Sequence, residues 1–420
     1  MIKTLMKLIV KIQDVVDVVK RFETSPGQAM HDLVTQVRVG AKEALERIMN
    51  AEIELFLGQD AEAANKRNGY SSRVFVMKGV GAVQLRIPRD RAGRFETKVV
   101  PASRRYDEPL EKDLALLHLA GLSTRTLSQV SQHVLGVRVS PQEVSNALKT
   151  IVPQAKAFLD RPLTGRAFKY LYIDGTNFLV RRTTVGREPT LVVVGVDETD
   201  RKSVLAMVQG DKDSRSAWAL VFTMLKERGL DGNAVELGIM DGLPGLAEAF
   251  QEAFPRARIC RCWVHKLRNV MPLVPKRYQA AFKADWDKMA YASSREVAQE
   301  AFTAFKSRWL PLCDDAVARF EKDLDKLLTH YDFPREHWNA LRTTNPIERV
   351  NKEFKGRSKA MEQMGSDGLK ALLAFTALRL EFGWQTTPIH SAKLANLNLS
   401  PTRRDHASAQ LDAITKALIH

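Results

Sequence analysis

Residues 169–176 read Lys-Tyr-Leu-Tyr-Ile-Asp-Gly-Thr, and the rest of the chain is interpreted around this stretch. Apolar and aromatic residues run up to a single carboxylate, Asp174, which is followed at once by Gly175. The pattern predicts a buried strand with an acid at or near its end. An isolated Asp-Gly pair is also a common turn former, so the pair alone does not define a site.

Two later carboxylates change that interpretation. Residues 238–242 repeat the order of apolar strand, acid and glycine, with Asp241 as the acid. Glu348 lies at the start of a predicted helix rich in lysine and arginine. Three carboxylates on a basic protein suggest acids that are gathered to hold divalent metal ions against phosphate.

The composition limits the class of protein. The chain has 420 residues, which is enough for two to four domains with hydrophobic cores. Hydrophobic residues make up 45% of the chain, as in ordinary soluble globular proteins. The net charge of +15 favours an acidic partner, most commonly nucleic acid, although a merely basic soluble protein explains the charge about as well.

The cysteines and residues 1–20 indicate the cellular compartment in which we expect the protein. Cys260, Cys262 and Cys313 make no disulfide framework, which favours a reducing cytoplasm. Residues 1–20 are apolar, but charged residues interrupt them too often for a membrane span or a signal-peptide core. We therefore expect a cytoplasmic protein without a membrane partner.

The N-terminal part divides into two regions. Residues 1–60 are predicted to be helical, and their apolar face fits either packing within the chain or a dimer contact. Residues 61–108 form a basic strand and hairpin segment that begins with an expected polar turn at 65–70. Arg89 and Arg91 alternate there with proline and glycine, which suits contacts with backbone phosphate, although a solvated loop explains them almost as well.

Residues 109–155 fit a small DNA-binding unit of the helix-turn-helix kind. Helices are predicted over 109–120, 124–135 and 141–151. Residues 140–143, Ser-Pro-Gln-Glu, form a capping box with proline at the first helical position. Any packed three-helix unit would show the same caps. The outward-facing residues that we expect to read bases are Gln142, Ser145, Asn146 and Lys149.

The segment 165–270 alternates strand and helix patterns in the order β-β-β-α-β-α-β-α. Three successive strands followed by βα units predict a mixed sheet with helices on both faces. Asp174 lies on the first strand. Asp241 ends the fourth strand, which we expect to lie beside the first.

The span between Asp241 and Glu348 is too long for a connection inside a compact sheet domain. Residues 271–340 are helical in pattern and predict an inserted helical subdomain. Residues 341–385 then return to the catalytic core as two helices, and 386–420 form a polar tail with weak periodicity. The tryptophans of the predicted insertion are Trp286, Trp309 and Trp338.

Phosphoryl transfer on DNA explains three such acids. It uses two Mg²⁺ ions about 3.5–4 Å apart, for which Mn²⁺ can substitute. Asp174 would bridge both ions, and Asp241 and Glu348 would complete the ligand set. Gly175 and Gly242 are expected to leave room for the DNA backbone. Water or a DNA 3′-hydroxyl attacks, so no covalent enzyme intermediate is required.

Cys262 and His265 fall on one face of the helix after the fifth strand. Together with Cys260 they raise the question of zinc, but no second pair at a suitable spacing supplies four ligands. We expect a packing or DNA-contact role, with zinc as the less favoured alternative.

Residues 342–357 form a basic run around the third acid. A solvated helix face is the usual explanation of such a run, but the neighbouring acid favours contact with DNA. The basic residues expected to contact DNA here and after the fifth strand are Lys266, Arg268, Arg349, Lys352 and Lys355.

Taken together, these motifs resemble the mutator-type transposases of bacterial insertion sequences, which carry a DDE catalytic triad on a ribonuclease-H-like fold. The matches follow the family order over roughly residues 35–385. The matching stretches are residues 67–70, 87–91 with Gly93 and Phe95, 121–125, 172–175, 241–246, 262–269 and 342–349.

The resemblance implies that Asp174, Asp241 and Glu348 are the metal-binding catalytic triad. It also implies an all-helical insertion between the second and third acids and a Cys-x-x-His signature after the second. A member of this family cuts at the terminal inverted repeats of its own element and joins the 3′ ends to target DNA. We accordingly expect at least a dimer on DNA, in a bacterial cytoplasm and associated with the nucleoid.

The fold predicted in this way is an α/β catalytic domain with a ribonuclease-H-like mixed sheet. A helical insertion interrupts it, and mainly helical N-terminal regions for DNA binding and dimerisation precede it. Two other functions stay open. A ribonuclease-H-like nuclease would cut DNA without joining it, and an inactive transposase-derived regulator would only bind DNA. The retained triad speaks against the regulator.

Overall fold

The computed structural model describes residues 19–59, 65–135, 137–181, 185–358, 366–385, 388–389, 409 and 412–418. The chain is a mixed α/β protein with a helical N-terminal part. It divides into two compact units, of which the first comprises Met1–Ala115 and Thr124–Ala147 and the second comprises Leu116–Ser123 and Leu148–His420.

The first unit is built on one long helix and a β-hairpin. Helix α2 spans Pro26–Gln59, and residues 19–24 are also helical, so the helical prediction is confirmed where the structure describes residues 1–60. Residues 1–18 lie outside the described part. Strands β1 (Arg67–Met77) and β2 (Gly81–Asp90) pair antiparallel. They pack with α2 around a cluster that contains Met49, Phe75, Val83, Leu85 and Val100.

The predicted polar turn at residues 65–70 is wrong, because β1 already begins at Arg67. The pairing register shifts between Arg67 and Tyr70, where Gly69 has a φ of +67°. Glycine adopts this left-handed conformation without steric cost, and an extra residue there makes a bulge rather than a turn. A strand that starts with a bulge looks like a turn in the sequence.

Three helices follow the hairpin at the predicted places. They are α3 (Glu108–Leu119), α4 (Thr124–Leu135) and α5 (Pro141–Leu159). The capping box is confirmed, because Glu143 N donates to Ser140 Oγ (3.2 Å) and Ser140 N donates to Glu143 Oε2 (2.6 Å). Helix α5 runs past its predicted end at residue 151 and through Pro153. Ile151 and Ala155 are fully buried one turn apart, and their packing outweighs the hydrogen bond lost at proline.

The second unit contains a five-stranded sheet in the order β5-β4-β3-β6-β7. Strands β3, β4 and β5 form an antiparallel meander, and β6 and β7 run parallel to β3. The predicted order of strands and helices is confirmed, as is the place of the fourth strand beside the first. The elements are β3 (Phe168–Arg181), β4 (Val185–Asp197), β5 (Lys202–Gln209), α6 (Arg215–Glu227), β6 (Leu237–Met240), α7 (Pro244–Ala253), β7 (Arg258–Arg261) and α8 (Trp263–Val270).

Strand β3 does not end near Asp174, contrary to the prediction. It continues to Arg181 and pairs along its whole length with β4, with Asp174 opposite Val192 and Arg181 opposite Val185. Gly175 is itself a paired residue of this hairpin. The first acid therefore lies in the middle of a strand whose neighbours hold it on both sides.

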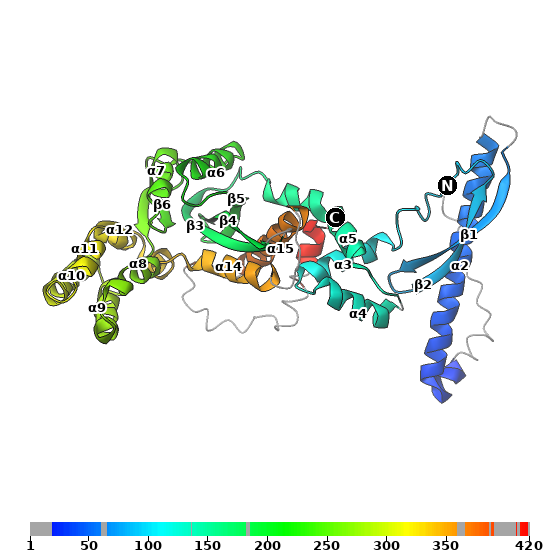
Figure 1. Cartoon of the computed structure of the whole chain (residues 1–420), viewed down its shortest axis with the longest axis horizontal. Helices are drawn as coiled ribbons and strands as arrows, with labels where there is room; N and C mark the ends of the chain where they lie inside the picture. The colour runs from blue at the N-terminus through cyan, green and yellow to red at the C-terminus, as the bar shows by residue number, and fades with distance from the viewer. Residues whose placement is uncertain are drawn as a thin grey trace. The chain divides into compact units, whose positions relative to one another are not determined.

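Helices cover both faces of the sheet, as predicted (Figure 1). Odd-numbered residues of β3, such as Leu171 and Ile173, pack against the aromatic side chains of α6 and α7. Even-numbered residues point to the other face, where the Tyr170 ring meets Phe333 and His337. On this second face α14 (Asn345–Ser358) contacts β3 and β4, and α15 (Ser366–Gln385) contacts β5.

Between α8 and α14 every regular element is helical. The α-helices are α9 (Gln279–Ala290), α10 (Arg295–Trp309), α11 (Asp314–Glu321), α12 (Leu324–Leu328) and α13 (Trp338–Leu341). They enclose a core of their own that includes Phe282, Trp286, Trp309 and Phe320. Trp286 and Trp309 are each 1% exposed, so both act in packing.

The C-terminal part is described in pieces. Residues 359–365, where the prediction placed the break between the last two core helices, lie outside the described residues. Residues 412–418 form a further short helix. None of the helices in the described ranges is long and apolar enough to cross a membrane.

Gly238→Ala tests the packing of α7 against the sheet. Gly238 lies in the centre of β6, and a methyl group there would collide with the ring of Phe250. We expect the variant to lower the free energy of unfolding by about 1–3 kcal/mol through overpacking. Gly356→Ala is the control, since its helical site on α14 is open, and it should gain about 0.5–1 kcal/mol. Chemical denaturation of both variants measures this, and equal effects would contradict the packing described.

Candidate active site

The first two acids come together through one strand pairing. Strands β3 and β6 are parallel, with Ile173 opposite Met240, and Asp174 and Asp241 each follow directly. Neighbouring strands lie about 4.8 Å apart, and paired positions point to the same face. Asp174 is 8% exposed and Asp241 is half-buried. The register thus places two carboxylates at the same level on the face that α14 covers.

Burial and neighbouring charge disfavour the charged form of the Asp174 carboxylate. Burial raises its pKa to about 6, and the nearby negative charge of Asp241 acts in the same direction. His265 and Lys212 lower the pKa but only in part. A site that disfavours its own negative charge gains stability when a cation binds.

The third acid enters from the first turn of α14. The carbonyl oxygen of Thr344 accepts hydrogen bonds from Ile347 N (2.9 Å) and Glu348 N (3.1 Å), so Thr344 begins this helix. The Glu348 Oε1 atom lies 3.1 Å from Arg268 Nη1 and 3.9 Å from His265 Nε2. Both basic residues come from α8.

His265 connects the three acids. The hydrogen bond with Cys262 raises the pKa of His265 to about 9 against the opposing effect of burial. The charges of Asp174 and Asp241 raise it further, and the Glu348 carboxylate lies beside its other ring nitrogen. One imidazolium thus faces all three carboxylates.

The glycines after the acids do not leave the space that we expected. A Cβ on Gly175 would collide with the Lys212 side chain, and a Cβ on Gly242 would collide with the Arg261 guanidinium. Side chains of the protein itself therefore cover both glycines, and they bring two further cations next to the acids. At Gly175 the contact is with Lys212 Cβ, so a side chain there would displace the Lys212 segment, whereas the group over Gly242 is the end of the flexible Arg261 side chain.

The donor set fits a hard divalent cation. It offers carboxylate oxygens, two of them on adjacent strands, in a partly buried place. Within the described ranges no three His, Cys, Asp or Glu side chains are already arranged as ligands of one ion. Glu348 instead pairs with Arg268, which is the kind of contact that a cation would replace. Among the described residues, Cys262 and His265 also have no third His, Cys, Asp or Glu side chain that would complete a zinc site with them.

Most of the residues predicted to contact DNA are exposed. These are Arg89, Arg91, Gln142, Asn146, Lys149, Arg268, Arg349, Lys352 and Lys355. Ser145 is exposed as well. On α5, Gln142 Nε2 donates to Asn146 Oδ1 (3.1 Å), so these two amides form one polar surface.

Lys266 is placed differently from the other basic residues. It is only 4% exposed, and its ammonium is paired with Asp323. Arg261 approaches the same carboxylate at 3.4 Å. A buried lysine that is already paired with a carboxylate has a structural role. We therefore no longer expect Lys266 to contact DNA.

The sequence interpretation missed three residues of this site. Thr344 carries a detectable signal, since threonine before Asn-Pro is a typical helix start. Lys212 and Arg261 carry none, because they reach the acids only through packing of distant segments. Lys212 comes from the loop before α6, and Arg261 ends β7.

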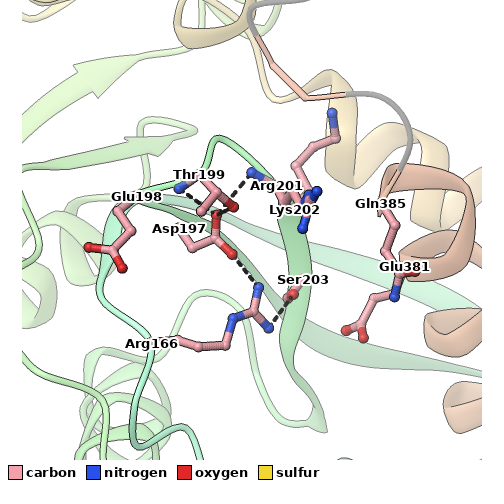
Figure 2. A pocket seen from close by; sticks show the side chains of 9 residues that line it. All are labelled: Arg166, Asp197, Glu198, Thr199, Arg201, Lys202, Ser203, Glu381 and Gln385. Atoms are coloured by element: carbon pink, nitrogen blue, oxygen red, sulfur yellow. Dashed lines mark hydrogen bonds and ion pairs between the residues drawn. The ribbon is translucent and has the colours of Figure 1, made fainter.

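A separate cavity of about 350 Å³ opens between the β4–β5 turn and α15 (Figure 2). Two of the carboxylates that line it are paired, Asp197 with Arg166 and Glu381 with Arg161. Asp197 is paired with Phe168 at the start of β3, which places it about 20 Å along the strand from Asp174. This cavity does not belong to the group of acids.

Asp174→Asn tests the electrostatic cost of the charged carboxylate at the first acid. The pKa of Asp174 is about 6 in the folded chain and about 4 in an unfolded one. The folded protein therefore binds this proton more tightly, and its stability falls as pH rises through that window. Without metal at pH 8, the neutral variant should gain about 2–3 kcal/mol. The gain should vanish below about pH 3, where the carboxyl is protonated in both the folded and the unfolded wild type.

Asp285→Asn serves as the matched control in the same denaturation experiment. Asp285 is equally buried, but it accepts hydrogen bonds from Arg308 (2.9 Å) and Trp309 Nε1 (3.0 Å). The substitution should destabilise the protein, because the amide has one acceptor oxygen and no charge where Lys288, Arg308 and Trp309 now donate to two carboxylate oxygens. Destabilisation by both substitutions at pH 8 would refute the conclusion that burial disfavours the charged form of Asp174.

Comparison with known proteins shows the family to which the chain belongs. A model of the Mutator family of transposases matches residues 11–376. The transposase for insertion sequence element IS905 of Lactococcus lactis is 31% identical over 328 residues, which cover 77% of this chain and 83% of that protein. The transposase for ISRM5 of Rhizobium meliloti is 29% identical over 340 residues (79% and 84%). The transposase for IS256 in transposon Tn4001 of Staphylococcus aureus is 28% identical over 298 residues (70% and 75%). The resemblance inferred from the motifs is confirmed, and the chain belongs to the Mutator family of transposases.

Proposed function

We propose that this transposase binds the terminal inverted repeats of its insertion sequence, cleaves DNA there and transfers the strands to target DNA. Asp174, Asp241 and Glu348 are the catalytic triad in this proposal. The observation that carries it is the register of β3 and β6, which sets two of the three carboxylates side by side. Relatives named as transposases for insertion sequences support the substrate.

The triad would hold two Mg²⁺ ions, with Mn²⁺ as a substitute. Such ions would supply Lewis acidity for activating the attacking oxygen and for stabilising the leaving 3′ oxygen. The secondary structure of the chain fixes the position of each acid. Asp174 lies within a strand, Asp241 directly follows the neighbouring strand, and Glu348 lies in the first turn of a helix. Arg268 and His265 hold the Glu348 carboxylate from the side of α8.

DNA contacts are proposed for exposed basic and polar surfaces. Arg349, Lys352 and Lys355 project from the helix that carries the third acid and would contact phosphates beside the reacting strand. Arg89 and Arg91 would do the same from the end of the hairpin. The polar residues of α5 would read base edges.

An oligomer on DNA, at least a dimer, is also part of the proposal. Helix α2 exposes apolar side chains at helical spacing, which supports its use as a dimer contact. These residues are Met30, Leu33, Val34, Val37, Ile48 and Leu55.

We propose that residues 165–270 and 341–385 form a ribonuclease-H-like core and that 271–340 are inserted into it. The antiparallel meander with two parallel strands beside β3 supports the core. The separate hydrophobic core of the helices after α8 supports the insertion. Residues 1–60, 61–108 and 109–155 would provide dimerisation and DNA binding, and 386–420 would form a tail.

A strand-transfer assay tests the reaction. It combines the full chain, a labelled duplex from the flank of its own gene, a supercoiled plasmid and Mg²⁺. We expect wild type to join the label to the plasmid and Asp174→Ala to lose this activity by at least about a thousandfold, since one carboxylate ligand is gone. Joining by Asp174→Ala at the wild-type rate would rule out the proposed triad.

The other outcomes of that assay separate the alternatives. Cleavage of the labelled end without joining would indicate a ribonuclease-H-like nuclease. Binding without metal-dependent cleavage at the correct end would indicate a regulator that only binds DNA.

Two sets of variants separate phosphate binding from base reading. Lys352→Ala with Lys355→Ala should weaken binding to all duplexes alike and reduce the salt dependence of log Kd by about one unit for each phosphate that is no longer neutralised. Asn146→Ala should cost about 1–3 kcal/mol for the terminal repeat and much less for random duplex. Gel shifts at several stated salt concentrations measure both. Equal loss of affinity for repeat and random DNA with Asn146→Ala would remove α5 from base reading.

A further inference from the structure

Cys262 lies where all three segments of the candidate active site meet. It is 2% exposed and sits at the junction of β7 and α8, directly before the first residue of that helix. Its backbone N–H donates to Met240 O (3.0 Å), and Met240 is the residue before Asp241. Met240 in turn pairs with Ile173, the residue before Asp174. The backbone of Cys262 is therefore tied to the strands that carry the first two acids.

The sulfur of Cys262 is tied to the third acid. Thr344 N donates to Cys262 Sγ (3.4 Å), and Thr344 Oγ1 donates to the same atom (3.5 Å). Thr344 O then accepts from Glu348 N (3.1 Å). One side-chain atom thus receives two hydrogen bonds from the residue that begins the Glu348 helix.

Neighbouring contacts strengthen this junction. Trp263 N donates to Arg342 O (3.0 Å), and Cys260 Sγ donates to Leu341 O (3.6 Å). Residues 260–263 and residues 341–344 therefore lie side by side, although helices α9 to α13 separate them in the sequence. Thr344 is 1% exposed, so no water replaces a lost partner of its N–H.

His265 completes the arrangement one helical turn later. Its Nδ1 lies 3.4 Å from Thr344 Oγ1, and its Nε2 lies 3.9 Å from the Glu348 carboxylate. Hydrogen bonds from His265 and Thr344 overcome the effect of burial and lower the pKa of the Cys262 thiol, as expected for a sulfur that serves as an acceptor. Every polar contact of this sulfur points to the N-terminus of α14 or to His265.

We propose that Cys262 is a positioning residue of the triad, whose sulfur acts as a hydrogen-bond acceptor that fixes the start of α14 and thereby the place of Glu348. The sulfur needs no metal of its own and no nucleophilic role. Cys262 and His265 belong together because the first seats the helix and the second faces the carboxylate that this helix carries. The inference rests on the proposed function for the role of Glu348, but the anchoring itself does not.

The test uses the full chain with Cys262→Ala, Cys262→Ser and the control Cys313→Ala. Cys313 is also buried, but its thiol donates to Trp309 O within the helical core, away from the acids. Hydrogen–deuterium exchange of the metal-free proteins is followed in residues 341–350. We expect faster exchange there in Cys262→Ala, partial recovery in Cys262→Ser because a hydroxyl still accepts, and wild-type exchange in Cys313→Ala.

Binding of Mn²⁺, followed by electron paramagnetic resonance, gives the second readout. Loss of a residue that orients a metal ligand typically weakens binding about 10- to 100-fold, which we expect for Cys262→Ala and in lesser degree for Cys262→Ser. If Cys262→Ala does not fold, Thr344→Val removes the hydroxyl donor at nearly the same volume and should show the same two changes to a smaller extent.

Unchanged exchange in residues 341–350 of Cys262→Ala would overturn the proposal. So would faster exchange that Cys262→Ser and Cys313→Ala show equally, because this is a general loss of packing. If wild type itself binds no Mn²⁺ and transfers no strand, the proposed function fails, and the exchange measurement still decides whether Cys262 anchors α14.

Discussion

The parallel pairing of β3 with β6 is the constraint on which the candidate active site depends. It fixes two carboxylates at one level because each directly follows a paired residue. A slip of the register by one residue would turn one acid to the opposite face of the sheet, toward the aromatic core under α6 and α7. Gly238 supports this register from within β6, since the ring of Phe250 occupies the space where a side chain would be.

Holding acids together in this way carries an electrostatic cost. Burial and mutual repulsion raise the pKa of Asp174, and the protein surrounds the group with cations from other elements. Lys212 and Arg261 cover the glycines, and Arg268 and His265 hold Glu348. The same charges that stabilise the acids in the free protein are near a place where a DNA phosphate would add further negative charge.

The order of strands and helices in the second unit was predictable because the spacing of apolar residues within each segment indicates its secondary structure. The neighbour relation of β3 and β6 was expected from the pattern of three successive strands followed by βα units. The predictions that were wrong concern features that depend on contacts between distant segments. The length of β3 depends on β4, the burial of Lys266 depends on Asp323, and the continuation of α5 past Pro153 depends on what buries Ile151 and Ala155. The covering of Gly175 and Gly242 has the same origin.

The helices between α8 and α14 have their own core, yet the third acid lies beyond them in sequence. Under the proposed function, a chain that is truncated anywhere between Asp241 and Glu348 keeps the hairpin, helix α5 and two of the acids but lacks the third. Such a product would still occupy DNA ends without cutting them. A single early stop would then convert a recombination enzyme into a competitor of its intact copies, and an element that makes both forms would limit its own spread.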